Sequence, residues 1–168
     1  LDRAKEMYPD DDRVHQALAI LNVTEGKTDQ AITHLQEAVE KKSDDARSML
    51  SLADLQLQKG DLEAVRKTLE KMRSAGYRPE IIRYFEARIL VAEGKWREAV
   101  YALERLETEL GQYPQFRTQL DLLLGLCFEQ LRLPDRQLDT YQRAVQNDPE
   151  LPAARLGYAS ALFRVGKV

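Results

Sequence analysis

A set of residues that recur every 34 positions constrains this chain more than any other feature. The series keep one phase along the sequence, with a single 38-residue interval in the third repeat. Small residues recur at Ala19, Ala53, Ala87, Gly125 and Ala159; glycines recur at Gly26, Gly60, Gly94 and Gly166, with Arg132 in the fourth repeat; larger apolar side chains recur at Leu35, Leu69, Leu103 and Tyr141; and a further series runs Ala4, Ala38, Met72, Leu106 and Ala144. Such a period is typical of stacked units that each bury their apolar face on a neighbour.

Each series has a physical role in a pair of antiparallel helices. The small residue allows two helices to cross closely. The glycine ends the first helix with a positive φ, and a polar residue such as Asp61 then caps the second helix. At Arg132, either a residue other than glycine adopts a positive φ or the turn differs. Leu, Ala, Glu, Arg and Gln, all good helix formers, dominate the composition.

The pattern predicts ten helices and no strand. The expected ranges are 1–8, 12–25, 28–42, 44–59, 61–75, 79–93, 95–110, 114–131, 134–147 and 151–166. The four extra residues of the third repeat amount to about one helical turn. We therefore expect a long helix on one or both sides of the junction at Gly111–Pro114.

The segment from Tyr84 to Ala99 resembles the tetratricopeptide repeat most clearly, and the resemblance extends over essentially the whole chain. It implies an all-α, right-handed superhelical solenoid of antiparallel helix pairs in a single domain, residues 1–168. The implied divisions are a lone helix 1–8, repeats 12–45, 46–79, 80–117 and 118–151, and a lone helix 152–166. One departure is consistent, because the family's Trp at position 4 is replaced. The residues found there are His15, Met49, Arg83, Asp121 and Arg155.

The resemblance also implies a concave face, lined by the first helix of each repeat, that binds a partner peptide or helix. The predicted partner-binding residues are Arg13, Gln16, Arg47, Leu50, Asp54, Gln58, Ile81, Tyr84, Arg88, Val91, Gln119, Leu122, Leu126, Glu129 and Phe163. Tyr84 and Arg88 are the expected anchors, since Tyr and Arg are frequent at interfaces. The alternative of packing between adjacent first helices stays open for Ile20, Leu50, Leu122 and Leu126. Gln16 and Ile20 do not fit the basic clamp with which some members of the family bind a terminal carboxylate.

Charge and hydropathy disfavour binding to nucleic acid and insertion into a membrane. The net charge is −3 and the basic residues are scattered among carboxylates, which disfavours nucleic acid. No apolar run reaches the roughly 18 residues of a membrane span. The single cysteine, Cys127, leaves the compartment open, with the cytosol favoured over the periplasm. Because Leu1 opens within a predicted helix, we expect the sequence to be part of a longer chain.

The sequence offers no constellation for catalysis. His15 and His34 are 19 residues apart and are interpreted as surface or packing residues, so no metal site is predicted. Cys127 shares the phase of Leu21, Leu55, Ile89 and Ala161, which predicts a buried thiol. We expect no catalytic residue and no cofactor.

The leading hypothesis is therefore a scaffold that binds a protein or peptide partner. One alternative is self-association into a homo-oligomer through apolar end faces. In that case Tyr158, Ala161, Leu162 and Val165 would lack a covering helix. Another alternative is a regulatory segment attached to a catalytic domain outside these residues.

Overall fold

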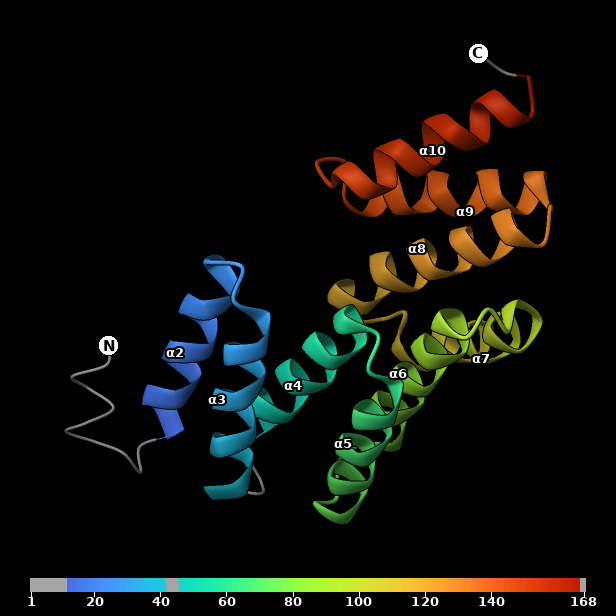
Figure 1. The fold of residues 1–168 in the computed structure, drawn as a ribbon. Helices are drawn as coiled ribbons and strands as arrows, with labels where there is room; N and C mark the ends of the chain where they lie inside the picture. The colour runs from blue at the N-terminus through green and yellow to red at the C-terminus, as the bar shows by residue number, and fades with distance from the viewer. Residues whose placement is uncertain (1–11, 42–45, 167–168) are drawn as a thin grey trace. The chain divides into compact units, whose positions relative to one another are not determined.

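All regular secondary structure in the described part of the chain is α-helical. The computed structural model describes residues 12–41 and 46–166, and Figure 1 shows their helices. The nine helices in these ranges are α2 (Asp12–Thr24), α3 (Thr28–Lys41), α4 (Ala46–Lys59), α5 (Leu62–Ser74), α6 (Pro79–Ala92), α7 (Trp96–Leu110), α8 (Pro114–Gln130), α9 (Pro134–Asn147) and α10 (Pro152–Arg164). These bounds confirm the predicted ones to within two residues. The predicted helix 1–8 and Ala4 lie outside the described residues.

The chain divides into two compact units, Leu1–Ile82 and Arg83–Val168, here called the N-terminal and the C-terminal unit. In the N-terminal unit α2 packs on α3, α3 on α4, and α4 on α5. In the C-terminal unit α7 packs on α8, α8 on α9, and α9 on α10, with a further contact between α8 and α10. Within each unit these helices thus pack mainly on their neighbours in sequence, as stacked hairpins require. The single-domain organisation stays a prediction.

The repeated apolar residues form the core of both units. Ala19, Ala53 and Ala87 are buried at the helix crossings, and Leu35, Leu69 and Leu103 are buried beside them. The series that includes Ala38, Met72, Leu106 and Ala144 is also buried. Ala159 is exposed, because among the described helices none follows α10 to cross it.

In the fourth repeat a different pair of residues packs where the helices cross. Its small residue is Gly125 on α8, and its large residue is Tyr141 on α9. A Cβ placed on Gly125 would lie 2.7 Å from the Tyr141 ring, and one on Gly157 of α10 would lie 2.3 Å from it. The Tyr141 ring therefore lies between the backbones of two glycines. The fourth repeat has glycine and tyrosine at the two places where the earlier repeats have alanine and leucine.

The turns after the first helices share one geometry. Gly26, Gly60, Gly94 and Gly166 have φ between 69° and 78°, and Arg132 has φ 56°. The N–H of Asp61 donates to the Gln56 carbonyl at 3.0 Å, and the N–H of Leu133 donates to the Phe128 carbonyl at 2.9 Å. The hydrogen bonds after α8 thus match those of a glycine turn, so Arg132 adopts the left-handed conformation and the turn does not differ.

We predict that Arg132→Gly stabilises the C-terminal unit by about 1 kcal/mol. A left-handed conformation costs a residue with a Cβ about 1–2 kcal/mol. Glycine avoids this cost, but it also raises the conformational entropy of the unfolded chain, which cancels part of the gain. The Arg132 side chain is exposed, so little packing is lost. Urea unfolding measures the change, and Gly60→Ala is the matched control, expected to shift stability in the opposite direction. An unchanged or lower midpoint for Arg132→Gly would contradict the argument.

The extra residues of the third repeat lengthen the helices at its end. Helix α8 has 17 residues and α7 has 15, against 13 or 14 in the other described helices. The break between them falls at residues 111–113, and Pro114 occupies the first turn of α8, where its missing N–H is not needed. The prediction of a long helix at this junction is confirmed.

Candidate functional site

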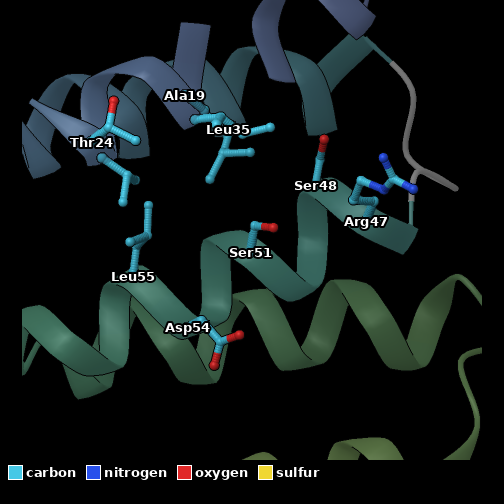
Figure 2. Close-up of a pocket in the computed structure, with 10 residues that line it drawn as sticks. Ala19, Thr24, Leu35, Arg47, Ser48, Ser51, Asp54 and Leu55 are labelled. Atoms are coloured by element: carbon cyan, nitrogen blue, oxygen red, sulfur yellow. The ribbon is translucent and has the colours of Figure 1, made fainter. Parts of the chain in front are cut away.

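An apolar groove in the N-terminal unit lies between α2, α3 and α4. It has a volume of about 280 Å³. Figure 2 shows Thr24 and Leu35 on one side of it and Ser51 and Leu55 on the other. The lining residues are Ala19, Ile20, Val23 and Thr24 of α2, Leu35 of α3, and Arg47, Ser48, Ser51, Asp54 and Leu55 of α4.

The groove combines buried and exposed apolar side chains. Ala19, Leu35 and Leu55 are buried, whereas Ile20 is 62% exposed and Val23 is 46% exposed. Ile20 and Val23 are three residues apart and so lie on the same side of α2. Together with the apolar hollow, Ile20 and Val23 form a continuous exposed apolar surface.

Helix α4 supplies the polar groups of the groove. Arg47 is exposed, Asp54 is half-buried, and Ser51 lies between them in sequence. Arg47 and Asp54 are seven residues apart, two helical turns on one face. Two predicted binding residues of this unit, Arg47 and Asp54, therefore line the groove. Ile20 and Val23, which were not among those predictions, line it as well.

The other predicted residues of the N-terminal unit do not line the groove. Leu50 and Ile81 are half-buried, and Gln58 is exposed near the end of α4. The side chains of Arg13 and Gln16 lie outside the described part of the structure.

The expected anchors of the third repeat lie in an aromatic cluster. Tyr84 is only 7% exposed, and its ring meets the Phe116 ring edge-on with centroids 5.3 Å apart. The Arg88 guanidinium lies 5.4 Å from the Tyr84 ring and 5.2 Å from the Phe85 ring. Val91 is buried as well. Tyr84 and Val91 therefore expose little side chain to a partner.

Predicted residues on α8 are divided between packing and exposure. Leu122 packs against the core formed by Leu138, Tyr141 and Ala161, which agrees with the packing alternative for that residue. Leu126 is half-buried and Gln119 is exposed. Glu129 accepts a hydrogen bond from Arg164 at 2.5 Å.

Helix α10 differs from the sequence-based expectation for the end face. Ala161 is buried, and Tyr158, Leu162 and Val165 are half-buried against the same core as Leu122. The expectation that this side lacks cover is wrong for Ala161, because α10 packs on α9, whereas the other three side chains stay partly exposed. Its exposed apolar side chains are instead Phe163 (73%) and Leu156 (74%).

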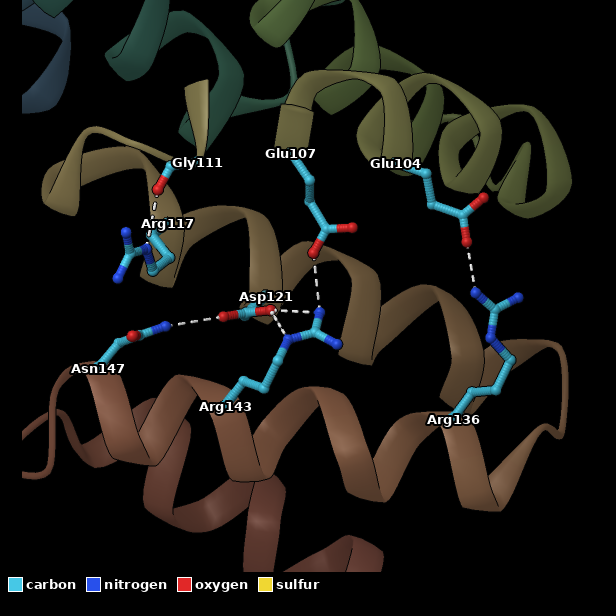
Figure 3. Close-up of polar contacts among 8 residues, drawn as sticks. All are labelled: Glu104, Glu107, Gly111, Arg117, Asp121, Arg136, Arg143 and Asn147. Carbon is cyan, nitrogen blue, oxygen red and sulfur yellow. Dashed lines mark hydrogen bonds and ion pairs between the residues drawn. The ribbon is translucent and has the colours of Figure 1, made fainter. Parts of the chain in front are cut away.

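Polar pairs at the place of the family's Trp are a feature that the sequence reasoning missed. Figure 3 shows Asp121 of α8 accepting hydrogen bonds from Arg143 (2.6 and 3.0 Å) and from Asn147 (3.0 Å). Burial raises the pKa of Asp121, and the Arg143 hydrogen bonds oppose that rise. In the third repeat the equivalent Arg83 pairs with Glu109. The sequence did contain a sign of these pairs. Asp121 and Arg143 are 22 residues apart and Arg83 and Glu109 are 26 apart, separations at which antiparallel helices bring opposite charges together.

A second polar group at this place joins the two histidines. His15 of α2 is 1% exposed, and its Nδ1 lies 3.0 Å from Glu37 Oε2 on α3. His34 Nδ1 lies 3.4 Å from the same oxygen. The 19-residue separation concealed this neighbourhood, because the hairpin of α2 and α3 brings the two rings together.

Two further expectations can be compared with the structure. Cys127 is buried, which confirms the predicted buried thiol, and burial raises its pKa to about 11. Leu21, placed in the same phase, is 38% exposed, so its predicted burial is wrong. Its side of α2 is covered by no helix in the described ranges. Across those ranges no helix has the length and apolar character needed to cross a membrane.

These observations define a class of protein: a chain of stacked antiparallel helix hairpins. Profiles described as "Tetratricopeptide repeat" match residues 23–89 and residues 84–152. The chain belongs to the tetratricopeptide repeat family, and it is a scaffold for protein interactions of the general kind that this family forms. A comparison with curated proteins gives no significant match.

Solved structures share the fold. PilF of Pseudomonas aeruginosa is 18% identical, with a TM-score of 0.71 over 93% of this chain and 69% of its own. TTC0263, a thermophilic tetratricopeptide repeat protein of Thermus thermophilus, is 18% identical, with a TM-score of 0.75 over 94% of this chain and 84% of its own. YrrB, described as a tetratricopeptide repeat protein with an unusual peptide-binding site, is 17% identical, with a TM-score of 0.57 over 99% and 84%. At these identities the likeness concerns the fold.

Proposed function

We propose that the chain binds an apolar segment of a partner protein in the groove between α2 and α4. The observation that carries this proposal is the exposure of Ile20 and Val23 beside a hollow whose floor is apolar. Arg47 and Asp54 offer one charge of each sign, so a segment with a polar side and an apolar side complements the groove. The peptide-binding site in the description of YrrB supports peptide binding as a use of this fold.

The groove proposal is tested with Ile20→Asp combined with Val23→Asp. Two carboxylates in an apolar contact would be desolvated without a partner, so we expect captured proteins to fall at least tenfold. The full-length protein would be used as bait in extract from its source, with the retained proteins quantified by mass spectrometry. Both side chains are exposed, so the fold is expected to survive, and circular dichroism checks this.

Tyr101→Asp is the matched control for that experiment. Tyr101 is a similarly exposed large side chain, but it belongs to α7 and does not line the groove. A groove variant that retains every protein bound by the unchanged chain contradicts the proposal. Loss of the same proteins with Tyr101→Asp would show a general effect of charge.

Self-association is a second candidate, favoured by the exposed Leu156 and Phe163. These residues are seven apart on α10, so they form one apolar stripe. Sedimentation velocity over a range of concentrations distinguishes the two candidates. A dimer that Leu156→Glu dissociates supports self-association, whereas a monomer at all concentrations removes it.

A further inference from the structure

We propose that His15, His34 and Glu37 bind a divalent transition-metal ion of the zinc type, which joins α2 to α3. The three residues offer two imidazole nitrogens and a carboxylate oxygen, and their ligand atoms all lie within 4.8 Å of one another. Imidazole and carboxylate ligands suit Zn²⁺, Co²⁺, Ni²⁺ and Cu²⁺. This site is separate from the proposed groove and does not depend on it.

The separations between the ligand atoms fit one ion. Zinc bonds of about 2.0–2.1 Å in a tetrahedron place the ligand atoms about 3.4 Å apart. The distance from Glu37 Oε2 to His15 Nδ1 is 3.0 Å, and that to His34 Nδ1 is 3.4 Å. Two of the three edges of the coordination shell therefore have nearly the required length already. The third edge, between the two imidazoles, is within 4.8 Å.

The fold holds these ligands in place without a metal. His34 and Glu37 are three residues apart on α3 and so share one face of that helix. His15 approaches from α2 and is buried, while the side chains of His34 and Glu37 are 16% and 36% exposed. One ligand is thus fixed by packing, and an ion can reach the other two from solvent. Three protein ligands leave a fourth position for water.

Lys41 is the group that opposes metal binding. Its Nζ lies 3.3 Å from His15 Nε2, on the side of the ring away from Glu37. A ring bound to metal through Nδ1 carries its proton on Nε2, so the ammonium must leave before the ion binds. Lys41 is exposed and is the last residue of α3, so its side chain can turn into solvent. Lys41 therefore sets the affinity from outside the ligand set.

The arrangement gives two variants with opposite expected effects. Lys41→Gln removes the positive charge and supplies an amide oxygen that can accept the Nε2 proton, as outer partners of metal-bound histidines do. We expect it to bind Zn²⁺ about tenfold more tightly. His34→Gln removes a ligand from a half-buried position and should weaken binding at least tenfold. Glu37→Gln serves the same purpose if His34→Gln fails to fold.

The test is a titration of the untagged, chelator-treated full chain with Co²⁺, followed by displacement with Zn²⁺. We expect one ion per chain and visible absorption bands of four-coordinate cobalt, with the order of affinity Lys41→Gln, unchanged chain, His34→Gln. The thermal midpoint should rise with Zn²⁺ in the same order. Absence of saturable binding overturns the proposal, and so does binding by folded His34→Gln and Glu37→Gln variants that is as tight as binding by the unchanged chain.

Discussion

Gly125→Ala is expected to destabilise the protein by about 2 kcal/mol, although alanine normally favours a helix. A Cβ at residue 125 would lie 2.7, 2.8 and 2.9 Å from three atoms of the Tyr141 ring. Carbon atoms in good contact are about 3.5–4.0 Å apart, so the ring or a helix must move. Inserting one methyl group into a packed core costs about 1–3 kcal/mol when neighbours can adjust.

The Tyr141 ring is also confined from α10. A Cβ on Gly157 would approach Tyr141 even more closely, at 2.3 Å, so α10 blocks the ring on its other side. Tyr141 is buried, and burial raises the pKa of its phenol to about 12. We therefore place the packing cost at the upper end of the range, about 3 kcal/mol. The advantage of about 1 kcal/mol that alanine has over glycine in a helix offsets part of it and leaves the net loss of about 2 kcal/mol.

We expect the effect of Gly125→Ala on stability to change sign when residue 141 is leucine instead of tyrosine. The three earlier repeats combine alanine with leucine at these two places, as in Ala53 with Leu69. In a Tyr141→Leu variant, Gly125→Ala restores that combination and should stabilise the protein. Urea unfolding of the four proteins in this double-mutant cycle measures the coupling. A Gly125→Ala protein as stable as the unchanged chain would show that the ring can move.

The repeat phase was sufficient to predict the helices and most of the core. Leu35, Leu69 and Leu103 could be identified as buried because one physical requirement, close stacking of identical hairpins, recurs at each of them. Gly157 was not identified, since its role depends on a tyrosine that only the fourth repeat has. Leu21 was predicted to be buried because phase describes an interior repeat, whereas no described helix covers that side of α2.

The candidate site was predicted less completely than the fold. The expected concave face of the first helices included Arg47 and Asp54 among the predicted partner-binding residues, and both line the groove. The same rule selected Tyr84, which packs inside an aromatic cluster with Phe85 and Phe116. Helical phase specifies a direction around the axis, but it does not specify how closely the next helix approaches. The neighbours of His15 were missed for a related reason, since contacts across a hairpin are not visible in ligand spacing along one helix.

Arg143→Met is expected to destabilise the protein by about 2–3 kcal/mol at pH 7. The Asp121 side chain is 3% exposed, and Arg143 binds it through two nitrogens, at 2.6 and 3.0 Å. Without the guanidinium, a buried carboxylate keeps only the Asn147 amide as a partner within this network. Removing one partner of a fully buried ion pair costs about 3–5 kcal/mol. The lower value follows because Asn147 remains and the Arg143 side chain is itself half-exposed.

Arg136→Met on the same helix is the matched control. Arg136 pairs with Glu104, but both side chains are exposed, and such pairs contribute less than about 1 kcal/mol. Its guanidinium also lies over the Phe128 ring, at 4.1 Å from the centroid, and methionine can keep that contact. Equal losses for the two variants would show that the burial of Asp121 adds nothing.

The loss caused by Arg143→Met should become smaller in acid. Burial already holds the pKa of Asp121 above its ordinary value, and Arg143 works against that shift. Removing Arg143 raises the folded-state pKa further, so the folded protein binds the proton more tightly than the unfolded chain does. Protonation then favours the folded state, and stability is lost as pH rises through the folded-state pKa. Unfolding the variant and the unchanged chain at pH 5 and pH 7 should therefore show the smaller difference at pH 5. A difference that stays constant with pH would mean that the Asp121 carboxylate, once deprived of Arg143, finds water or another cation.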